Sequence, residues 1–359
     1  MASDDKHLMA VALEAARRAA YTSPNPKVGA IVVRDDAIIG EGFHLAHGAP
    51  HAEVEALRGI DAAGATLYVT LEPCTVEGRT PPCAPQVIAS GVGRVVVAME
   101  DPDPRVRGRG IAALRAAGID VQVGVLEDQA RVLNQAYIHH RTTGRPFLTL
   151  KLALSVDGHL GAPDGSSRWI TGADARKRVH ELRREVDAIL VGAGTVVTDD
   201  PSLTARDVAA ARQPARIVLD SSGRTPADAK VFAAEAPVLV ATTEAAGHDA
   251  HLEWKEAGAE VVVLPETVDG IDLHALMTSL GQRPMVHVLC EGGAELATSL
   301  LRADLVDRLE IHFGPVLTGG GPTLGDLGVT SMGDAPRWTL LDVGRYGSDA
   351  VLGFERERA

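Results

Sequence analysis

The residues best suited to chemistry are one histidine and two cysteines, His51, Cys74 and Cys83, together with Glu53. Zinc prefers thiolate and imidazole ligands in a tetrahedral shell, and a catalytic zinc keeps its fourth position open for water. One histidine and two cysteines therefore complete a set of three protein ligands. A His-x-Glu pair at a helix start places a carboxylate where it can exchange protons with that water without binding the metal. The pattern predicts a zinc-dependent hydrolytic site with Glu53 as general acid and base.

The spacing of the cysteines differs from the signature of zinc-dependent nucleobase deaminases, which is His-x-Glu followed by Pro-Cys-x-x-Cys. Here eight residues rather than two separate Cys74 from Cys83. His-x-Glu alone is common by chance, but its coincidence with a Pro-Cys pair and a further cysteine favours a metal site. A purely structural zinc is the milder alternative. It would leave Glu53 without a role and would usually require a fourth protein ligand.

Alternating strands and helices must position these residues, and this alternation predicts a three-layer α/β domain. Arg141-Thr-Thr-Gly-Arg-Pro146 has turn residues and no apolar periodicity, so we expect one domain over 1–146 and a second α/β domain over 147–359. In the first domain the pattern predicts helices over 6–18, 53–58, 82–90, 111–117 and 127–140, and strands over 28–33, 38–43, 66–71, 95–99 and 119–123. In the second it predicts strands over 147–154, 188–191, 217–219, 238–241, 261–264, 286–289 and 308–313, and helices over 173–185, 251–257, 273–280 and 295–302.

Composition and charge exclude several classes of protein. The 359 residues include 45% hydrophobic and 23% charged residues, which is ordinary for globular domains. The net charge of −13 disfavours a nucleic-acid-binding face, and residues 148–359 carry most of it, with 31 Asp/Glu against 20 Lys/Arg. No apolar run reaches the roughly 20 residues that span a bilayer, and the polar residues 1–7 do not show the pattern expected of a signal peptide. Three cysteines argue against a disulfide framework, so we expect a cytoplasmic protein.

Nucleotide-binding signals in the second half are weak when taken one at a time. Gly192-Ala-Gly194 lacks the last glycine of the dinucleotide fingerprint, and the glycine-rich stretch 318–325 lacks the lysine of a phosphate-binding loop. The order of elements is more informative, since one predicted strand leads into 192–195 and another ends at 291–293 before a helix. Glycine allows backbone to approach phosphate closely, and helix N-termini offer free N–H donors. This arrangement supports a nucleotide site without naming the nucleotide.

The order of motifs along nearly the whole chain resembles one known family, the bifunctional riboflavin-biosynthesis deaminase/reductases of the RibD type. In the first half the matching stretches are Pro24-Asn-Pro-Lys-Val-Gly29, His44, Pro50-His-Ala-Glu53, Leu71-Glu-Pro-Cys74, Gly78-Arg-Thr-Pro-Pro-Cys83 and Gly108-Arg-Gly110. In the second half they are Lys151-Leu-Ala-Leu-Ser-Val-Asp-Gly158, Ser167-Arg-Trp-Ile-Thr171, Asp199-Asp-Pro-Ser-Leu203 and Glu291-Gly-Gly293.

The resemblance implies a cytidine-deaminase-like domain followed by a dihydrofolate-reductase-like domain, with Zn²⁺ and NADPH as cofactors. The implied reactions are hydrolytic deamination of 2,5-diamino-6-(5-phosphoribosylamino)pyrimidin-4-one and NADPH reduction of the ribosyl side chain to ribityl. By this resemblance His51, Cys74 and Cys83 hold zinc, Glu53 shuttles protons, and the substrates are small phosphoribosylaminopyrimidines. We also expect a homo-oligomer.

The remaining site residues are carried over from the resemblance position by position. NADPH contacts are expected from Ala153, Trp169, Thr195, Asp199, Ser221, Gly293, Ala294, Glu295, Leu296, Ala297, Thr298 and Ser299. Substrate contacts are expected from Asn25, His44, Ser167, Arg183, Leu203, Arg206 and Glu291. Arg183 and Arg206 suit a ribose phosphate, because guanidinium pairs with phosphate through two hydrogen bonds. Lys151 and Asp199 are further polar groups that could assist the reduction.

Two departures from the family pattern bear on substrate contacts. Thr75-Val76 stands where the family commonly shows Ser-His, and Asp103 stands where it commonly shows Asn. The alternating Arg105, Arg107 and Arg109 could offset the added carboxylate, or could simply form a solvated loop. Two alternatives to the family function remain open at this point. One is another zinc nucleobase deaminase, for example a tRNA-editing one, and the other is a regulatory protein that senses NADPH without turnover.

Overall fold

The computed structural model describes residues 2–233 and 236–357. The chain divides into two compact units, Met1–Gly144 and Arg145–Ala359, and each unit has its own sheet and core. The expected domains, 1–146 and 147–359, meet close to this division. Their outermost residues, 1 and 358–359, lie outside the described part of the chain.

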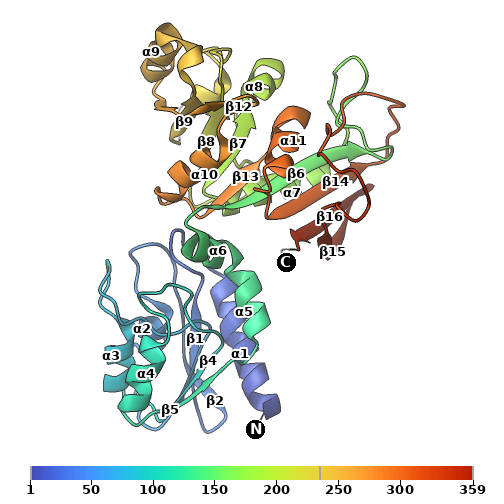
Figure 1. The fold of residues 1–359 in the computed structure, drawn as a ribbon. Helices are drawn as coiled ribbons and strands as arrows, with labels where there is room; N and C mark the ends of the chain where they lie inside the picture. The colour runs from blue at the N-terminus through green and yellow to red at the C-terminus, as the bar shows by residue number, and fades with distance from the viewer. Residues whose placement is uncertain (1, 234–235, 358–359) are drawn as a thin grey trace. The chain divides into compact units, whose positions relative to one another are not determined.

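The first unit is a five-stranded sheet in the order β2-β1-β3-β4-β5, covered by helices on both faces. Figure 1 shows α1 and α5 on one face and α2, α3 and α4 on the other. Strands β3, β4 and β5 are parallel, whereas β1 runs antiparallel to both of its neighbours. The strands are β1 (Gly29–Arg34), β2 (Ala37–Phe43), β3 (Thr66–Val69), β4 (Arg94–Val97) and β5 (Asp120–Val123). The helices are α1 (Ala2–Arg17), α2 (Ala52–Ala56), α3 (Cys83–Ala89), α4 (Arg109–Ala116), α5 (Glu127–Leu133) and α6 (Gln135–Thr143).

The helix expected over 127–140 is in fact two helices, because the chain breaks at Asn134. The backbone of Asn134 leaves the helical region, with φ at −109°. Its buried side chain accepts a hydrogen bond from the Lys27 amide (2.8 Å) and donates one to the Lys27 carbonyl (2.9 Å). These bonds tie the break to a loop more than 100 residues earlier in the chain, which local periodicity cannot reveal.

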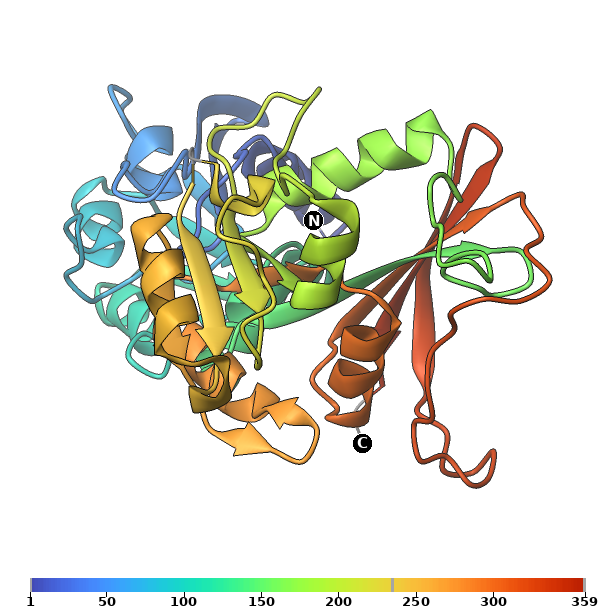
Figure 2. The same ribbon diagram turned by 90° about the horizontal axis from the view of Figure 1, so that it is seen from above.

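The second unit is built on a nine-stranded sheet in the order β10-β9-β8-β7-β13-β6-β14-β16-β15. The first seven strands in this order, β10-β9-β8-β7-β13-β6-β14, run parallel to one another. Strand β16 is antiparallel to β14, and β15 is antiparallel to β16. One face packs against α10 and α11 and the other against α7, α8 and α9, so there are two hydrophobic layers. Figure 2 shows the C-terminal strands, in red, extending the sheet.

The bounds of this unit's elements largely match the expected pattern. The parallel strands are β6 (Phe147–Ser155), β7 (Ala188–Gly192), β8 (Ala215–Leu219), β9 (Val238–Thr242), β10 (Glu260–Val263), β13 (His287–Cys290) and β14 (Arg308–Gly314). The other strands are β11 (Glu266–Thr267), β12 (Gly270–Ile271), β15 (Trp338–Tyr346) and β16 (Asp349–Arg356). The helices are α7 (Ala173–Glu185), α8 (Ala193–Asp199), α9 (His248–Glu256), α10 (Leu273–Gly281) and α11 (Ala294–Arg302), with 3₁₀ turns at Lys230–Phe232 and Glu244–Ala246.

The pattern missed three features of this unit, one of which is the short hairpin β11–β12. The hairpin β15–β16 was not expected, because β15 exposes Leu340, Leu341 and Val343 in a run that lacks the alternation of a half-buried strand. The glycine-rich turn expected at 192–195 opens directly into α8.

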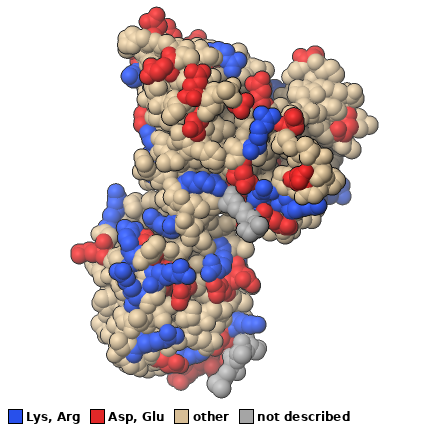
Figure 3. Space-filling view, viewed as in Figure 1, with Lys and Arg blue, Asp and Glu red and all other residues tan. Residues whose placement is uncertain are grey.

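The distribution of charged side chains and the length of the helices bear on two expectations from the composition, namely no basic face and no membrane-spanning helix. On the face shown in Figure 3, acidic side chains lie among the basic ones on both units. Within the described residues, the helices are too short or too polar to span a bilayer.

Candidate active sites

The three expected zinc ligands meet at one point of the first unit. His51 is the N-cap of α2, Cys74 lies in the loop after β3, and Cys83 is the first residue of α3. The Nδ1 atom of His51 lies 3.0 Å from the Cys83 Sγ and 3.6 Å from the Cys74 Sγ, and the three donor atoms all lie within 4.8 Å of one another. A tetrahedral zinc holds such atoms about 3.6 Å apart, so the donor types and their spacing fit the metal.

Glu53 lies in the first turn of α2, beside this cluster. Its side chain is buried, with 4% exposed, and the groups that face it are His51, Cys74 and Cys83. Burial raises the pKa of Glu53 to about 7. A carboxyl group in this state holds or releases a proton near neutral pH, as proton transfer to and from a substrate requires. Glu53 is not needed to complete the metal ligands, because the other three residues already supply them.

The long segment between the two cysteines has a structural role at the histidine. Thr80, which lies within it, places its Oγ1 3.1 Å from the His51 Nε2. When Nδ1 binds a metal between the cysteines, Nε2 carries the proton and donates it to Thr80. Such a contact fixes the tautomer and the ring orientation of a ligating histidine. The eight-residue spacing thus delivers a contact to the metal ligand that a two-residue spacing would not contain.

Asn25 and His44, expected to contact substrate, adjoin the zinc ligands. The His44 Nδ1 lies 3.1 Å from the Pro50 carbonyl oxygen and donates to it, so Nε2 can accept from the Asn25 Nδ2 at 3.0 Å. The rings of His44 and His51 stack edge to face, with centroids 5.3 Å apart. Burial lowers the pKa of His44 and keeps it neutral, so this pair offers hydrogen bonds rather than charge.

The added carboxylate at Asp103 is neutralised within its own loop. The Arg105 Nε lies 3.0 Å from the Asp103 Oδ1, and its Nη2 lies 2.6 Å from Oδ2. The Arg141 Nε approaches within 3.9 Å. Hydrogen bonds from Arg105 lower the pKa of Asp103, so it stays ionised but paired. Of the three alternating arginines, Arg105 is therefore the one that offsets the charge, whereas Arg107 lies near Glu100.

Glu72 anchors the loop that carries Cys74. Its buried carboxylate accepts hydrogen bonds from the amides of Asp101, Gly108, Gly110 and Ile111, at 2.8–3.2 Å. Gly110 is required here, because a Cβ would lie 1.9 Å from the Pro73 carbonyl oxygen. The strand end next to Cys74 is thereby fixed to the N-terminus of α4 by protein contacts alone.

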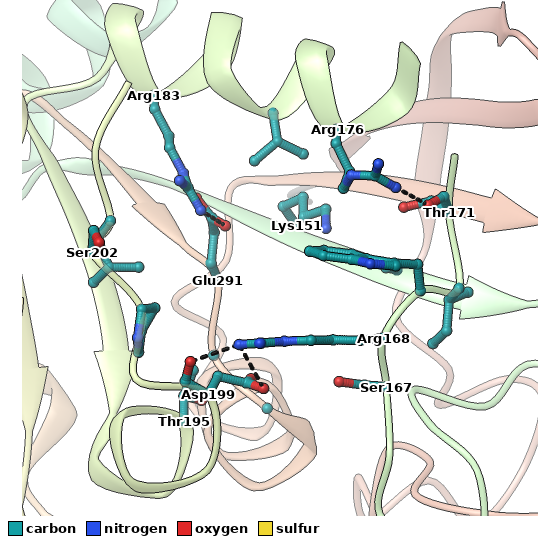
Figure 4. A pocket seen from close by; sticks show the side chains of 18 of the residues that line it. Lys151, Ser167, Arg168, Thr171, Arg176, Arg183, Thr195, Asp199, Ser202 and Glu291 are labelled. Carbon is teal, nitrogen blue, oxygen red and sulfur yellow. Dashed lines mark hydrogen bonds and ion pairs between the residues drawn. The ribbon is translucent and has the colours of Figure 1, made fainter. Parts of the chain in front are cut away.

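The second unit contains a cavity of about 710 Å³ at the carboxyl ends of parallel strands (Figure 4). In parallel α/β sheets this edge is the usual place for a ligand. Ten of the expected site residues line it, and Lys151 points into it from β6. These ten are Ala153, Ser167, Trp169, Arg183, Thr195, Asp199, Leu203, Arg206, Glu291 and Gly293.

Arg183 is committed to a partner inside this cavity. Its Nε and Nη2 donate to the two carboxylate oxygens of Glu291 at 2.7 and 2.8 Å, and its Nη1 donates to the Thr204 carbonyl at 3.0 Å. The side chain of Arg206, in contrast, makes no hydrogen bond or ion pair with any other described residue. Arg206 is therefore better placed than Arg183 to accept a phosphate.

Lys151 lies beside two acids. Lys151 on β6 lies opposite Glu310 on the neighbouring strand β14, and Glu291 is also close enough to interact with it. Burial lowers the pKa of Lys151, and these two acids oppose that effect. Glu310 is itself buried and bonded to His312 at 3.2 Å and Arg178 at 3.3 Å. Lys151 and Glu291 thus line the cavity, and Lys151 is linked through Glu310 to charged residues outside the lining.

A second cavity of about 620 Å³ adjoins the first and shares Leu160, Ser167, Thr195, Asp199 and Gly293 with it. It is also lined by Ser221 and by the exposed side of the α11 N-terminus, including Ala294, Glu295, Leu296 and Ser299.

Two expected NADPH contacts lie away from both cavities. Ala297 is buried in the hydrophobic core, and Thr298 donates to the Ala294 carbonyl at 2.7 Å.

Trp169, another expected NADPH contact, is largely exposed, and the guanidinium of Arg176 lies 4.4 Å from the centre of its ring. Arg168, Arg176 and His180 also line the first cavity and were not expected as site residues. Arg168 lies within the matching motif 167–171, whereas no local pattern marks Arg176 or His180. Figure 4 shows Arg168 reaching Asp199, whose carbonyl it meets at 2.6 Å.

Comparison with known proteins assigns each unit. Residues 2–99 match the cytidine and deoxycytidylate deaminase zinc-binding region, and residues 146–352 match the RibD C-terminal domain. The chain is 44% identical to the riboflavin biosynthesis protein RibD of Aquifex aeolicus, over 98% of both chains. It is 40% identical to that of Escherichia coli, over 97% of this chain and 98% of the other.

Solved structures give the same result. Acinetobacter baumannii RibD superposes with a TM-score of 0.90 at 37% identity, with all of both chains covered. A diaminohydroxyphosphoribosylaminopyrimidine deaminase/5-amino-6-(5-phosphoribosylamino)uracil reductase from Thermotoga maritima superposes with a TM-score of 0.85 at 35% identity, over 99% of both chains.

Proposed function

Because the chain belongs to the RibD family of bifunctional riboflavin-biosynthesis enzymes, we propose which of its residues carry out the two reactions. The expected family, fold, activity and cofactors are confirmed: the enzyme is a deaminase and reductase that uses zinc and NADPH. The tRNA-editing and NADPH-sensing alternatives are thereby set aside. We assign deamination to residues 1–146 and reduction to 147–359.

In the deaminase, His51, Cys74 and Cys83 hold the metal. Zinc, when bound, lowers the pKa of a water so that it attacks the carbon that bears the amino group. Glu53 takes a proton and delivers it to the departing ammonia. Asn25 and His44 bind the pyrimidine through hydrogen bonds, and Thr80 orients the His51 ring. The observation that carries this assignment is the convergence of the three donor atoms within 4.8 Å beside the buried Glu53.

In the reductase, the first cavity takes the phosphoribosyl substrate, and NADPH occupies the second cavity with its nicotinamide end reaching Ala153 and Trp169 in the first. NADPH, when bound, supplies the hydride that converts the ribosyl side chain to ribityl. The residues shared by the two cavities, including Thr195 and Asp199, lie where the reacting ends must meet. Arg206 binds the substrate phosphate, while Arg183 holds Glu291 in place beside Lys151. Ser167 and Leu203 complete the substrate wall.

The test is to supply the diaminopyrimidine substrate and follow ammonia release and NADPH oxidation separately. We expect both, with about one zinc per chain. Ammonia release without NADPH oxidation would remove the reductase assignment. NADPH oxidation on 5-amino-6-(5-phosphoribosylamino)uracil without any ammonia release from the first substrate would remove the deaminase assignment.

A cytoplasmic location and a homo-oligomeric state remain proposals. The three cysteines are free, as in a reducing compartment. The edge strand β15 exposes Leu340, Leu341 and Val343, and apolar edge surface of this kind is commonly covered by a subunit. Light scattering of the purified enzyme would show a multiple of 37.6 kDa if it is an oligomer.

A further inference from the structure

The second cavity of the reductase contains a cation that the assigned residues leave unused. Arg224 and Arg302 are the only arginine or lysine residues in its described lining. Arg302 donates to the Asp326 carbonyl at 2.5 Å. Arg224 makes no hydrogen bond or ion pair with any other described residue, and its side chain is exposed. An unpaired guanidinium in a binding cavity is free to bind an anion.

The loop that carries Arg224 is held rigidly at the carboxyl end of β8. Asp220 accepts hydrogen bonds from the amides of Ser222, Gly223 and Thr225 at 3.1, 2.9 and 2.6 Å. The Trp254 Nε1 donates to the Thr225 carbonyl at 2.9 Å. The backbone around Arg224 is therefore set before any ligand arrives, which reduces the entropy lost on binding.

Gly223 allows the tight turn that this loop makes. Its φ of +79° lies in the left-handed region, and a Cβ there would lie 2.7 Å from the Ala246 carbonyl oxygen. Glycine therefore allows the loop to turn tightly, directly before Arg224.

The position of Arg224 along the cavity identifies its ligand group. The nicotinamide must lie at the residues shared with the substrate cavity, because the hydride passes there. The N-terminus of α11, whose first amides have no side-chain cap, suits the pyrophosphate. Arg224 and Ser221 line only the second cavity, so they lie toward the adenosine end. The adenosine ribose of NADPH carries the 2′-phosphate that NADH lacks, and arginine accommodates this phosphate in other dinucleotide sites.

We propose that Arg224 binds the 2′-phosphate of NADPH and gives the reductase its preference for NADPH over NADH. This inference rests on the proposed binding of NADPH in the second cavity. It adds a residue that discriminates between two cofactors and takes no part in hydride transfer. Arg224 should therefore affect the KM for NADPH and leave kcat unchanged.

The test compares NADPH and NADH as reductants of 5-amino-6-(5-phosphoribosylamino)uracil in wild type, Arg224→Met and Arg224→Lys. Loss of charge-assisted hydrogen bonds should raise the KM for NADPH about 10- to 100-fold in Arg224→Met. The KM for NADH and kcat at saturating NADPH should stay unchanged. Arg224→Lys should retain part of the preference, because it keeps the charge but loses the paired donors. Arg302→Met is the matched control, since it removes the same charge from the same cavity, and should alter the preference less than about threefold.

Binding of adenosine 2′,5′-bisphosphate and of 5′-AMP separates this inference from the proposed function. Arg224→Met should weaken the bisphosphate and leave 5′-AMP unchanged. An equal loss for NADPH and NADH, an unchanged NADPH preference, or an equal effect of Arg302→Met would overturn the assignment. Failure of the wild type to oxidise NADPH would instead refute the proposed function. Unaltered ammonia release and melting temperature establish that each variant is folded.

Discussion

Replacement of Glu53 by glutamine tests the deaminase mechanism most directly. The substitution keeps the length of the side chain and one oxygen acceptor, but it removes the carboxyl group that we propose takes and returns a proton. Glu53 is 4% exposed, so solvent cannot easily replace the missing carboxylate. General acid–base groups contribute about 10²- to 10⁴-fold to rate, and burial places Glu53 toward the upper end. We expect deamination to fall about 10⁴-fold, or about 5.5 kcal/mol of transition-state stabilisation.

The assay is ammonia release with NADPH omitted, together with zinc content. Glu53→Gln should retain about one zinc, because His51, Cys74 and Cys83 supply the donors. Its NADPH oxidation on the deaminated substrate should equal that of wild type. Glu55→Gln is the matched control, since Glu55 lies in the same helix but pairs with Arg58 near the surface. A Glu53→Gln enzyme that holds zinc and deaminates within tenfold of wild type would refute the mechanism.

Three further predictions concern the same unit. Thr80→Val should weaken zinc about 10- to 100-fold in competition with a chelator while Thr80→Ser retains it, and equal affinities would exclude a role for the contact with His51. Zinc removal should stop ammonia release but leave NADPH oxidation on the deaminated substrate intact, and a parallel loss of both would contradict independent sites. Burial raises the pKa of Asp101 from 3.8 to about 6, so the folded state binds its proton more tightly than the unfolded state. Stability from this group is therefore present below pH 4 and lost as pH rises through 6. The unfolding free energy of wild type relative to Asp101→Asn should fall by about 3 kcal/mol between pH 3 and 7 in denaturant titrations, and a constant difference would refute the shift.

The sequence was most informative where function depends on neighbouring residues. His51, Glu53, Cys74 and Cys83 are held by short connections to strands and helix starts, so their spacing alone predicts a cluster. The inward orientation of Ala297 also follows from local periodicity, because it lies on the same helix face as the buried Leu300. The family resemblance placed it among NADPH contacts, whereas helix geometry turns it toward the core.

Contacts between distant segments could not be predicted from the sequence. Arg183 and Glu291 are 108 residues apart, and the ion pair between these two expected substrate contacts is visible only in the structure. The break at Asn134 depends in the same way on the distant Lys27. The structure is likewise needed to see that the Arg224 side chain makes no hydrogen bond or ion pair with another described residue, because the sequence does not show which side chains surround it.

The ion pair between Asp103 and Arg105 couples the energetic effects of substitutions at these two positions. A buried carboxylate needs a cation, so neither residue is a neutral change when it occurs alone. Removal of Arg105 leaves the buried Asp103 carboxylate with Arg141, 3.9 Å away, in place of a hydrogen-bonded cation. An uncharged amide at position 103 would need no such cation. The effect of a substitution at Arg105 therefore depends on the carboxylate of Asp103, with which Arg105 pairs through Nε and Nη2.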